Sequence, residues 1–314
     1  MILLDRPLLT AEYEDASQFH PEPSSVYLFG ARSEDRTRNL EAWRGRAADL
    51  DVVELTAEGT DAVLILSEDG RRVALRDERE LESIFEGRWG RHLYLDITGL
   101  SNHVWPAILK IVHGRMPISV MYVEPVNYAY SSSPRENVFF DLSELISGIS
   151  PIPQFSNLLE PDEDRVTLVP LLGFEGARFT HLLEEVQPPG DSIAPVVGVP
   201  GFRAEYPFFT FQGNQIPLKN SGAWRNVRYA KANCPFSLYY TLLDILSDSE
   251  DGQFFKIGLI GTKPHALGAV LFCLTHSEQV ELIYDHTKQQ ANRSAGLSRC
   301  LVYEVSAFLG QLHA

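Results

Sequence analysis

The chain has 314 residues, of which 44% are hydrophobic and 11% aromatic, so it can fill one large core or two of ordinary domain size. This composition excludes disorder over most of its length. Its formal net charge of −15, from 42 acidic against 27 basic residues, produces an averaged field that repels duplex DNA, RNA and anionic lipid, although a local basic pocket stays compatible with it.

The cysteines and the hydropathy pattern indicate the compartment. Cys234, Cys273 and Cys300 are widely scattered, which argues against a disulfide scaffold or a cysteine-rich zinc site and fits a reducing environment. Asp5 interrupts the first apolar residues before a signal-peptide core could form, and no apolar run approaches the roughly 18 residues of a spanning helix. We therefore expect a cytoplasmic protein that contacts no membrane and needs no metal or cofactor.

Along the chain, apolar β-rich runs alternate with helical patterns, which is typical of βαβ units and a mainly parallel sheet. In the first half this pattern predicts strands at residues 26–29, 51–55, 92–97 and 118–123 and helices at residues 35–46, 77–86 and 103–113. Residues 62–66 and 72–75 flank Glu68-Asp69-Gly70, which indicates a hairpin with a glycine-containing turn.

Periodicity stops after Pro125, and proline and serine then gather at residues 131–134 and 150–153. We place the boundary there, between an N-terminal Rossmann-like half at residues 1–146 and a C-terminal Rossmann-like half at residues 147–314. In the second half the pattern predicts strands at residues 166–172, 193–199, 254–260, 280–284 and about 301–305, and helices at residues 177–187, 235–247 and 264–276.

A long insertion, Gly201 to Asn233, interrupts the second half. Its aromatic residues, which are too apolar for a free loop, are Phe208, Phe209, Phe211 and Trp224. We predict that it caps a cleft or forms a partner interface, the alternative being that it packs as a satellite core.

Both halves have the same order of elements, and the spacing from Gly99 to Tyr122 and from Gly261 to Tyr284 is 23 residues in each case. The sequence therefore predicts an α/β fold of two related Rossmann-like halves with mainly parallel sheets, produced by tandem duplication. Doubly wound folds share this element order by default, so the order alone does not establish a duplication.

The ligand site of a parallel sheet lies at the carboxyl ends of its strands, where helix N-termini favour anions. Gly261-Thr262-Lys263-Pro264-His265 occupies such a position: glycine permits a tight turn, proline suits a first helical turn, and Thr262 and Lys263 offer a hydroxyl and a cation. This predicts a phosphate site with Lys263 in the turn, at the mouth of a polar pocket. An ordinary strand-to-helix turn with a solvated lysine is the alternative.

Other candidate ligand-binding residues follow further strands of the two halves. They are Asp96, Thr98, Ser101, Arg32, Glu34, Arg36 and Tyr122 in the first half, and Glu175, Arg178, Tyr284 and Asp285 in the second. Tyrosine can stack on a base, and acidic and basic groups can bind a nucleotide. The alternatives are helix capping by Ser101, acid–arginine pairs that brace helix starts, and tyrosines that cover a core.

Common catalytic motifs are missing from the chain. It has no G-x-S-x-G, H-E-x-x-H or G-x-G-x-x-G, and no H-x-E with P-C-x-x-C. This weighs against common hydrolases, zinc deaminases and dehydrogenases and leaves the catalytic residues unassigned.

The run from Gly261 to Ala269 resembles the G-T-K-P loop of CARF domains, Rossmann-like sensors of cyclic oligonucleotides in prokaryotic antiviral systems, and two fused CARF-like units resemble a SAVED domain. The resemblance implies that Thr262 and Lys263 face ligand phosphate and ribose, with Asp96, Thr98 and Ser101 at the pseudo-symmetric position. The first half lacks the lysine, and the 314 residues contain no recognisable nuclease, protease or membrane effector domain.

We therefore expect a nucleotide-binding sensor or regulatory subunit that binds a cyclic-oligonucleotide-like anion and passes the signal to a protein partner carrying the effector activity. The alternatives are an enzyme, either a metal-independent phosphodiesterase or a nucleoside-processing glycosidase, and a structural subunit of a larger complex.

Overall fold

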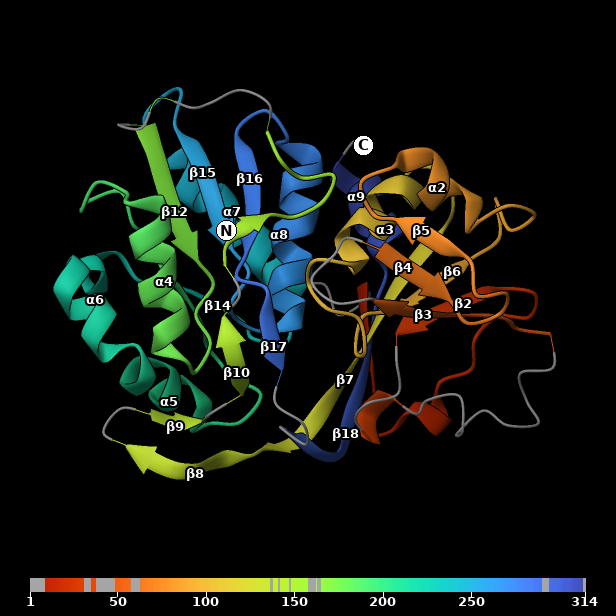
Figure 1. Ribbon diagram of the computed structural model, residues 1–314, viewed down its shortest axis with the longest axis horizontal. Coiled ribbons are helices and arrows are strands. Elements are labelled where there is room, and N and C mark those ends of the chain that lie inside the picture. The colour runs from red at the N-terminus through yellow and green to blue at the C-terminus, as the bar shows by residue number, and fades with distance from the viewer. Residues whose placement is uncertain are drawn as a thin grey trace. The chain divides into compact units, whose positions relative to one another are not determined.

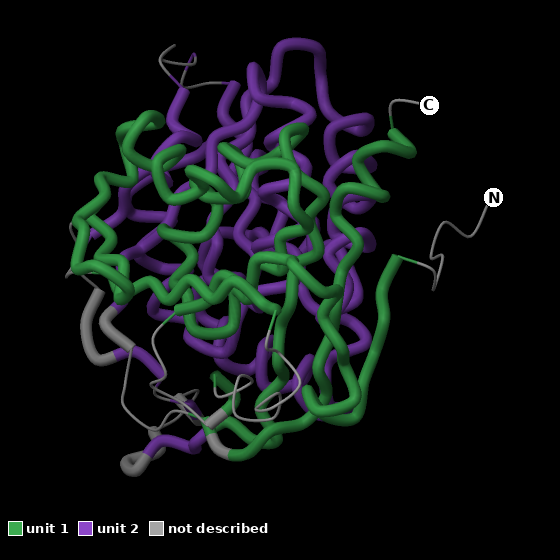
Figure 2. The backbone as a smooth tube through the Cα atoms, turned by 90° about the vertical axis from the view of Figure 1, so that its right-hand side faces the viewer, with its two compact units in different colours: residues 1–128, 294–314 green, residues 129–293 purple. Residues whose placement is uncertain are grey.

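A computed structural model describes residues 9–30, 35–37, 49–57, 63–135, 138–140, 142–146, 148–157, 162, 165–289 and 294–312 (Figure 1). The chain divides into two compact units (Figure 2): unit 1 comprises residues 1–128 and 294–314, and unit 2 comprises residues 129–293. The division differs from the expected one at residue 146, because the C-terminal strand pairs with strands of unit 1 and unit 2 is therefore inserted within it.

Unit 1 contains one eight-stranded sheet. Its strands, in spatial order, are β1 (Thr10–Tyr13), β18 (Ser294–Tyr303), β7 (Ile118–Tyr128), β6 (Leu93–Asp96), β2 (Val26–Gly30), β3 (Asp51–Ala57), β4 (Val63–Leu66) and β5 (Arg72–Ala74). The four strands β7, β6, β2 and β3 are parallel, and antiparallel strands flank them on both sides. Every residue of β2 and β6 is buried, as expected for the centre of a parallel sheet.

The helices of unit 1 follow local signals. They are η2 (Ala16–Gln18), η3 (Asp35–Thr37), α2 (Glu78–Ser83), α3 (Trp105–Val112) and α9 (Val305–Leu312). Asp77 caps α2 by accepting from the N–H groups of Arg79 and Glu80. All residues of α3 except Lys110 are buried, which explains its continuous apolar sequence. Of the predicted helix at residues 35–46, only Asp35–Thr37 lies within the described residues, where it is a 3₁₀ turn.

Unit 2 is built around a smaller sheet with the order β11 (Ser150–Pro151), β16 (Val280–Tyr284), β15 (Phe254–Gly258), β12 (Val166–Pro170). Parallel bridges from Leu168 to Ile193 and from Leu171 to Val196 place β13 (Val196–Gly198) beside β12, and β14 (Arg228–Ala230) pairs with β13 in parallel. Two-stranded pairings join β8 (Tyr130–Arg135) to β9 (Val138–Phe140) and β10 (Ser143–Ile146) to β17 (Thr287–Gln289).

The helices of unit 2 pack in pairs. They are α4 (Gly176–Val186), α5 (Tyr206–Gly213), α6 (Gln215–Ser221), η5 (Ala223–Asn226), α7 (Pro235–Ser247) and α8 (Lys263–Thr275). The helices α4 and α6 contact each other, as do α7 and α8. A core cluster joins Phe179 and Leu182 of α4 to Leu218 of α6 and Leu168 of β12. Because α6 contributes to this core, the insertion is part of unit 2 and not a detached segment.

The parallel strands have the same order in both units. In unit 1 the order is β7-β6-β2-β3. In unit 2 it is β16-β15-β12-β13, with β14 as an additional parallel strand beside β13. When β14 is left out of the count, both orders place the fourth, third, first and second strand side by side. The α/β fold class, with parallel strands in the main sheet of each unit, is confirmed. The tandem duplication remains a prediction with which this shared order agrees.

Sequence patterns missed the elements that depend on distant partners. After Pro125, where no strand was predicted, β7 continues to Tyr128 because it pairs with β18. The final strand, expected near residues 301–305, is Ser294–Tyr303, and residues 305–312 form α9. The hairpin of β4 and β5 is confirmed, with Gly70 at a φ of 72° in its turn.

Candidate anion-binding site

The turn at Gly261 lies after β15, at the carboxyl end of the parallel strands of unit 2. Helix α8 begins at Lys263, one residue earlier than predicted, because Thr262 acts as its N-cap. The Thr262 hydroxyl donates to the carbonyl oxygen of Ala232 at 2.9 Å and accepts from the N–H of His265 at 3.3 Å. Its single proton is therefore already used within the protein, and the charged group that the turn presents is the half-buried Lys263.

His265 is completely buried and holds α8 against the end of β14. Its Nε2 lies 3.0 Å from the carbonyl oxygen of Lys231, so this nitrogen carries the proton and donates. Its Nδ1 has no hydrogen-bond partner among the described residues. Burial lowers the pKa of His265 to about 4, so the ring is neutral at pH 7. His265 therefore positions the backbone of the site and adds no charge.

Three predicted ligand-binding residues of unit 2 are bonded to one another or to the backbone. The Nε and Nη2 of Arg178 donate to the two carboxylate oxygens of Asp285 at 2.5 and 2.6 Å. Although burial opposes the charge of Arg178, the buried carboxylate of Asp285 raises its pKa above the ordinary value. Glu175 accepts from the N–H groups of Leu142 and Ser143, both at 2.9 Å. This geometry favours the bracing alternative for these residues.

Tyr284 is also buried, and its hydroxyl lies 3.4 Å from the hydroxyl of Thr287. Its ring makes an edge contact with His286, with the ring centroids 5.5 Å apart. A ring in this position covers the core, so base stacking at Tyr284 would require the side chain to move.

In unit 1, the polar groups at the corresponding strand ends form hydrogen bonds within the protein. Asp96 accepts from the hydroxyl of Tyr27 at 2.5 Å and from the N–H of Thr98 at 2.8 Å. The Thr98 hydroxyl accepts from the N–H of Val123 at 3.0 Å. Asp96 and Thr98 are both buried, and these hydrogen bonds join them to the sheet or its turn.

Two of the remaining candidates of unit 1, Arg36 and Tyr122, contact each other. Buried Arg36 donates from Nη1 to the Tyr122 hydroxyl and to the carbonyl oxygen of Val123, both at 3.2 Å. Burial raises the pKa of Tyr122 well above its ordinary value, so the hydroxyl stays neutral. Ser101 caps no helix but lies 3.0 Å from Nδ1 of His103. The predicted residues Arg32 and Glu34 lie outside the described residues.

The two units share one kind of arginine contact. An arginine that follows the first strand contacts the fourth strand or the residue after it. Arg36 binds Tyr122 and Val123 within β7, and Arg178 binds Asp285 directly after β16. The units differ at the turn after the third strand, because unit 1 has no counterpart of Lys263. The site with a cation is therefore in unit 2.

Sequence reasoning missed the part that the insertion plays at this site. Lys231 and Ala232 follow β14 and present the carbonyl oxygens that His265 and Thr262 bind. Strand β14 has three residues, Arg228–Ala230, which is too short for a period-2 pattern to be recognised. The separation of about 30 residues between Ala232 and Thr262 leaves no local signal of their contact.

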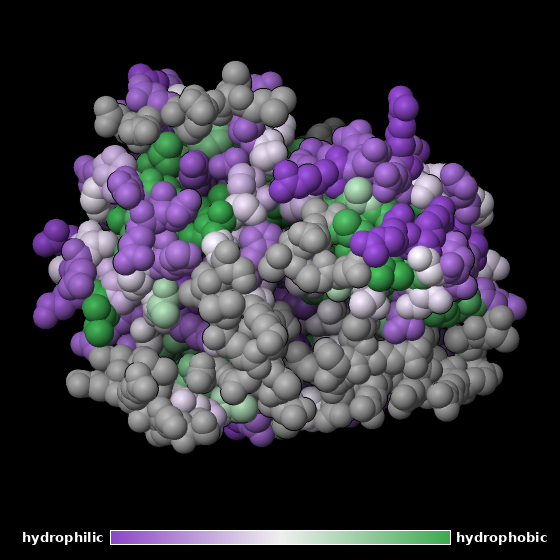
Figure 3. All heavy atoms as spheres, viewed as in Figure 1, coloured by the Kyte–Doolittle hydropathy of each residue, from purple (hydrophilic) through white to green (hydrophobic). Residues whose placement is uncertain are grey.

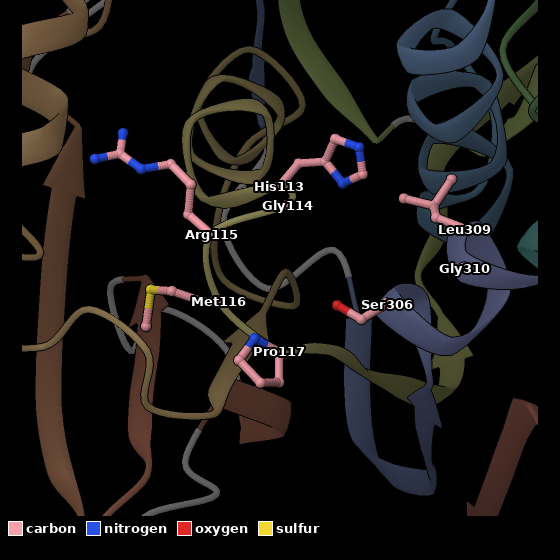
Figure 4. Close-up of a pocket in the computed structure, with 8 residues that line it drawn as sticks. All are labelled: His113, Gly114, Arg115, Met116, Pro117, Ser306, Leu309 and Gly310. Carbon is pink, nitrogen blue, oxygen red and sulfur yellow. The ribbon is translucent and has the colours of Figure 1, made fainter. Parts of the chain in front are cut away.

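A surface pocket of about 570 Å³ lies elsewhere in unit 1, near the amino end of β7 (Figure 4). Its lining residues are His113, Gly114, Arg115, Met116, Pro117, Ser306, Leu309 and Gly310. Figure 4 shows Arg115 directed away from Leu309; its guanidinium pairs with Glu82 and stacks over Trp89. Ser306 accepts from the N–H of Ile118. None of the predicted site residues lines this pocket, and these polar groups stabilise the fold around it.

The sequence matches no protein-family model, and no curated protein matches it. Within the described residues, no helix is both long and apolar enough to span a membrane. The same part of the chain has no group of three or more His, Cys, Asp or Glu side chains arranged to hold a metal ion.

Proposed function

We propose that the chain is a regulatory subunit that binds a nucleotide-like anion at the Gly261 turn of unit 2. The observation that carries this proposal is the position of Lys263. Its cation stands in the first turn of a 13-residue helix, at the carboxyl end of parallel strands. The positive end of α8 adds to the field of the lysine, so both favour phosphate at one place.

The hydrogen bonds around the turn suit binding better than catalysis. The Thr262 hydroxyl caps α8 and His265 is buried and neutral, so neither supplies a general base at the surface. A binding module of this kind acts by passing its ligand-bound state to a protein partner. The resemblance of the turn to CARF domains adds a ligand class, cyclic oligonucleotides, and a setting in cytoplasmic antiviral defence.

The experiment is a titration of the full chain and of Lys263→Ala with cyclic di-, tri- and tetra-adenylate, with ATP as a linear comparison. Losing one charge-assisted contact should weaken binding by about 10- to 100-fold. Lys110→Ala, which removes an exposed lysine from α3, is the matched control and should bind like the parent. Separating the nucleotides after incubation distinguishes binding from cleavage. Equal affinities of parent and Lys263→Ala, or no binding by the parent, would overturn the proposal.

A further inference from the structure

The insertion differs in charge from the rest of the protein. Residues 201–233 contain five basic residues and one acidic residue, a net charge of +4, in a chain whose net charge is −15. The rest of the chain therefore carries −19. A segment of opposite sign within an acidic protein provides a local surface to which polyanions are attracted.

The outward side of the same segment is aromatic and apolar. Phe208 is 75% exposed, Ile216 57%, and Trp224 and Tyr229 56% each. The inward side is fixed, since Leu218 and Ala223 belong to the core of unit 2. Figure 3 shows hydrophobic surface among hydrophilic residues at the left edge of the view, where α6 lies in Figure 1. These side chains are therefore displayed by a folded scaffold.

The aromatic rings form two groups. Phe208 and Phe211 are three residues apart on α5 and so share one helix face, and the ring of Phe211 contacts that of Tyr229 with centroids 6.5 Å apart. Trp224 carries the guanidinium of Arg225 over its ring, 5.1 Å from the centroid. Each group combines a planar apolar surface with nearby hydrogen-bonding or cationic groups.

Two cations of the segment are available to a ligand. Arg203 pairs with Glu205, and Arg228 pairs with Asp248. Lys219, which is exposed on α6, and Arg225 form no ion pair within the part of the chain that the structure describes. Their charges are therefore uncompensated on the outward side of the insertion.

We propose that this aromatic and basic face of residues 201–233 binds single-stranded nucleic acid. Exposed aromatic rings stack on unpaired bases whatever their sequence, and uncompensated cations bind the phosphates between them. A duplex does not offer its base faces, and an apolar protein partner would leave Lys219 and Arg225 without counter-charges. This proposal does not depend on the nucleotide site at Gly261.

The experiment measures binding of a fluorescein-labelled oligo(U) of about 20 nucleotides to the full chain by anisotropy, between about 50 and 200 mM salt. Phe208→Ala and Trp224→Ala should each weaken binding roughly tenfold, because each removes one stacking surface. Lys219→Ala and Arg225→Ala should each reduce the slope of log affinity against log salt by about one. All four side chains are exposed, so circular dichroism should show unchanged folding.

The controls separate this surface from the rest of the protein. Lys110→Ala should bind oligo(U) like the parent, and the oligo(U)–oligo(A) duplex should bind more weakly than the single strand. Absence of binding at low salt, or equal binding by the parent and both aromatic variants, would overturn the proposal. So would sedimentation showing that the parent self-associates through this face and that Phe208→Ala is monomeric, since the face would then be a protein interface.

Discussion

Thr262 and His265 show how a polar residue near a candidate site can serve the fold. Both bind the backbone that follows β14, through carbonyl oxygens of Ala232 and Lys231. The hydroxyl and the ring nitrogen therefore position the turn, while Lys263 supplies its charge. A residue type that can bind a ligand therefore stabilises the fold here, because its hydrogen bonds are made to the backbone of the protein itself.

The titration of His265 should make the stability of unit 2 depend on pH. Burial lowers its pKa to about 4 in the folded chain, whereas an unfolded histidine titrates near 6.5, so the unfolded state takes up a proton first. The contribution of this group is complete above pH 6.5 and is lost as the pH falls toward 4. Between pH 7 and 5 the free energy of unfolding should fall by about 2 kcal/mol more in the parent than in His265→Gln.

The measurement is urea unfolding of both proteins at the two pH values. Glu124 titrates in the same range with the opposite sign, because burial raises its pKa to about 7, but it is present in both proteins and cancels in the comparison. The same pH dependence in parent and variant would show that His265 does not titrate as its burial requires.

At the scale of elements, each unit has a glycine at or near the end of its first strand, and this glycine lies close to the turn after the third strand. A Cβ on Gly30 would lie 2.7 Å from the carbonyl carbon of Gly99, and a Cβ on Gly173 would lie 2.7 Å from the carbonyl oxygen of Ile260. In both units the end of the first strand therefore packs against the turn after the third strand. This contact lies at the edge of the sheet where the candidate residues are found.

Gly30→Ala and Gly173→Ala should each destabilise the protein by about 1–3 kcal/mol, because the added methyl group meets backbone atoms that must move. Gly190→Ala is the matched control, since a Cβ there has no atom within 4 Å and the substitution should be nearly neutral. Urea unfolding of the three variants tests this. If Gly173→Ala were as stable as Gly190→Ala, the close approach of the two turns would be wrong.

For the whole molecule, the main consequence of the topology is that unit 2 is inserted between two paired strands of unit 1. Tyr128 and Ser294, which flank unit 2 in the sequence, are direct partners in the antiparallel pairing of β7 and β18. The sheet of unit 1 is formed entirely by strands outside residues 129–293.

A chain in which Asn-Gly replaces residues 129–293 should therefore fold as unit 1 alone, because a two-residue turn of this type joins antiparallel strands without disturbing their register. Circular dichroism and the dispersion of the amide NMR signals measure this, together with cooperative thermal unfolding. A shortened chain in which Gly-Gly-Ser-Gly replaces the same residues guards against a failure of the turn itself. Unfolded protein in both cases would show that unit 1 needs unit 2 to fold.

The sequence by itself determined the alternation of strands and helices, the hairpin of β4 and β5, and the positions of the turns at Gly99 and Gly261. These features depend on periodicity, glycine and capping residues within a few positions of each other, so local pattern suffices to predict them. Only the tertiary structure decided that β18 joins the sheet of unit 1, that β14 supports the Gly261 turn, and that Arg178 binds Asp285 across 107 residues. Such pairings are selected by packing and by the hydrogen-bonding needs of buried groups, which involve residues far apart in the chain.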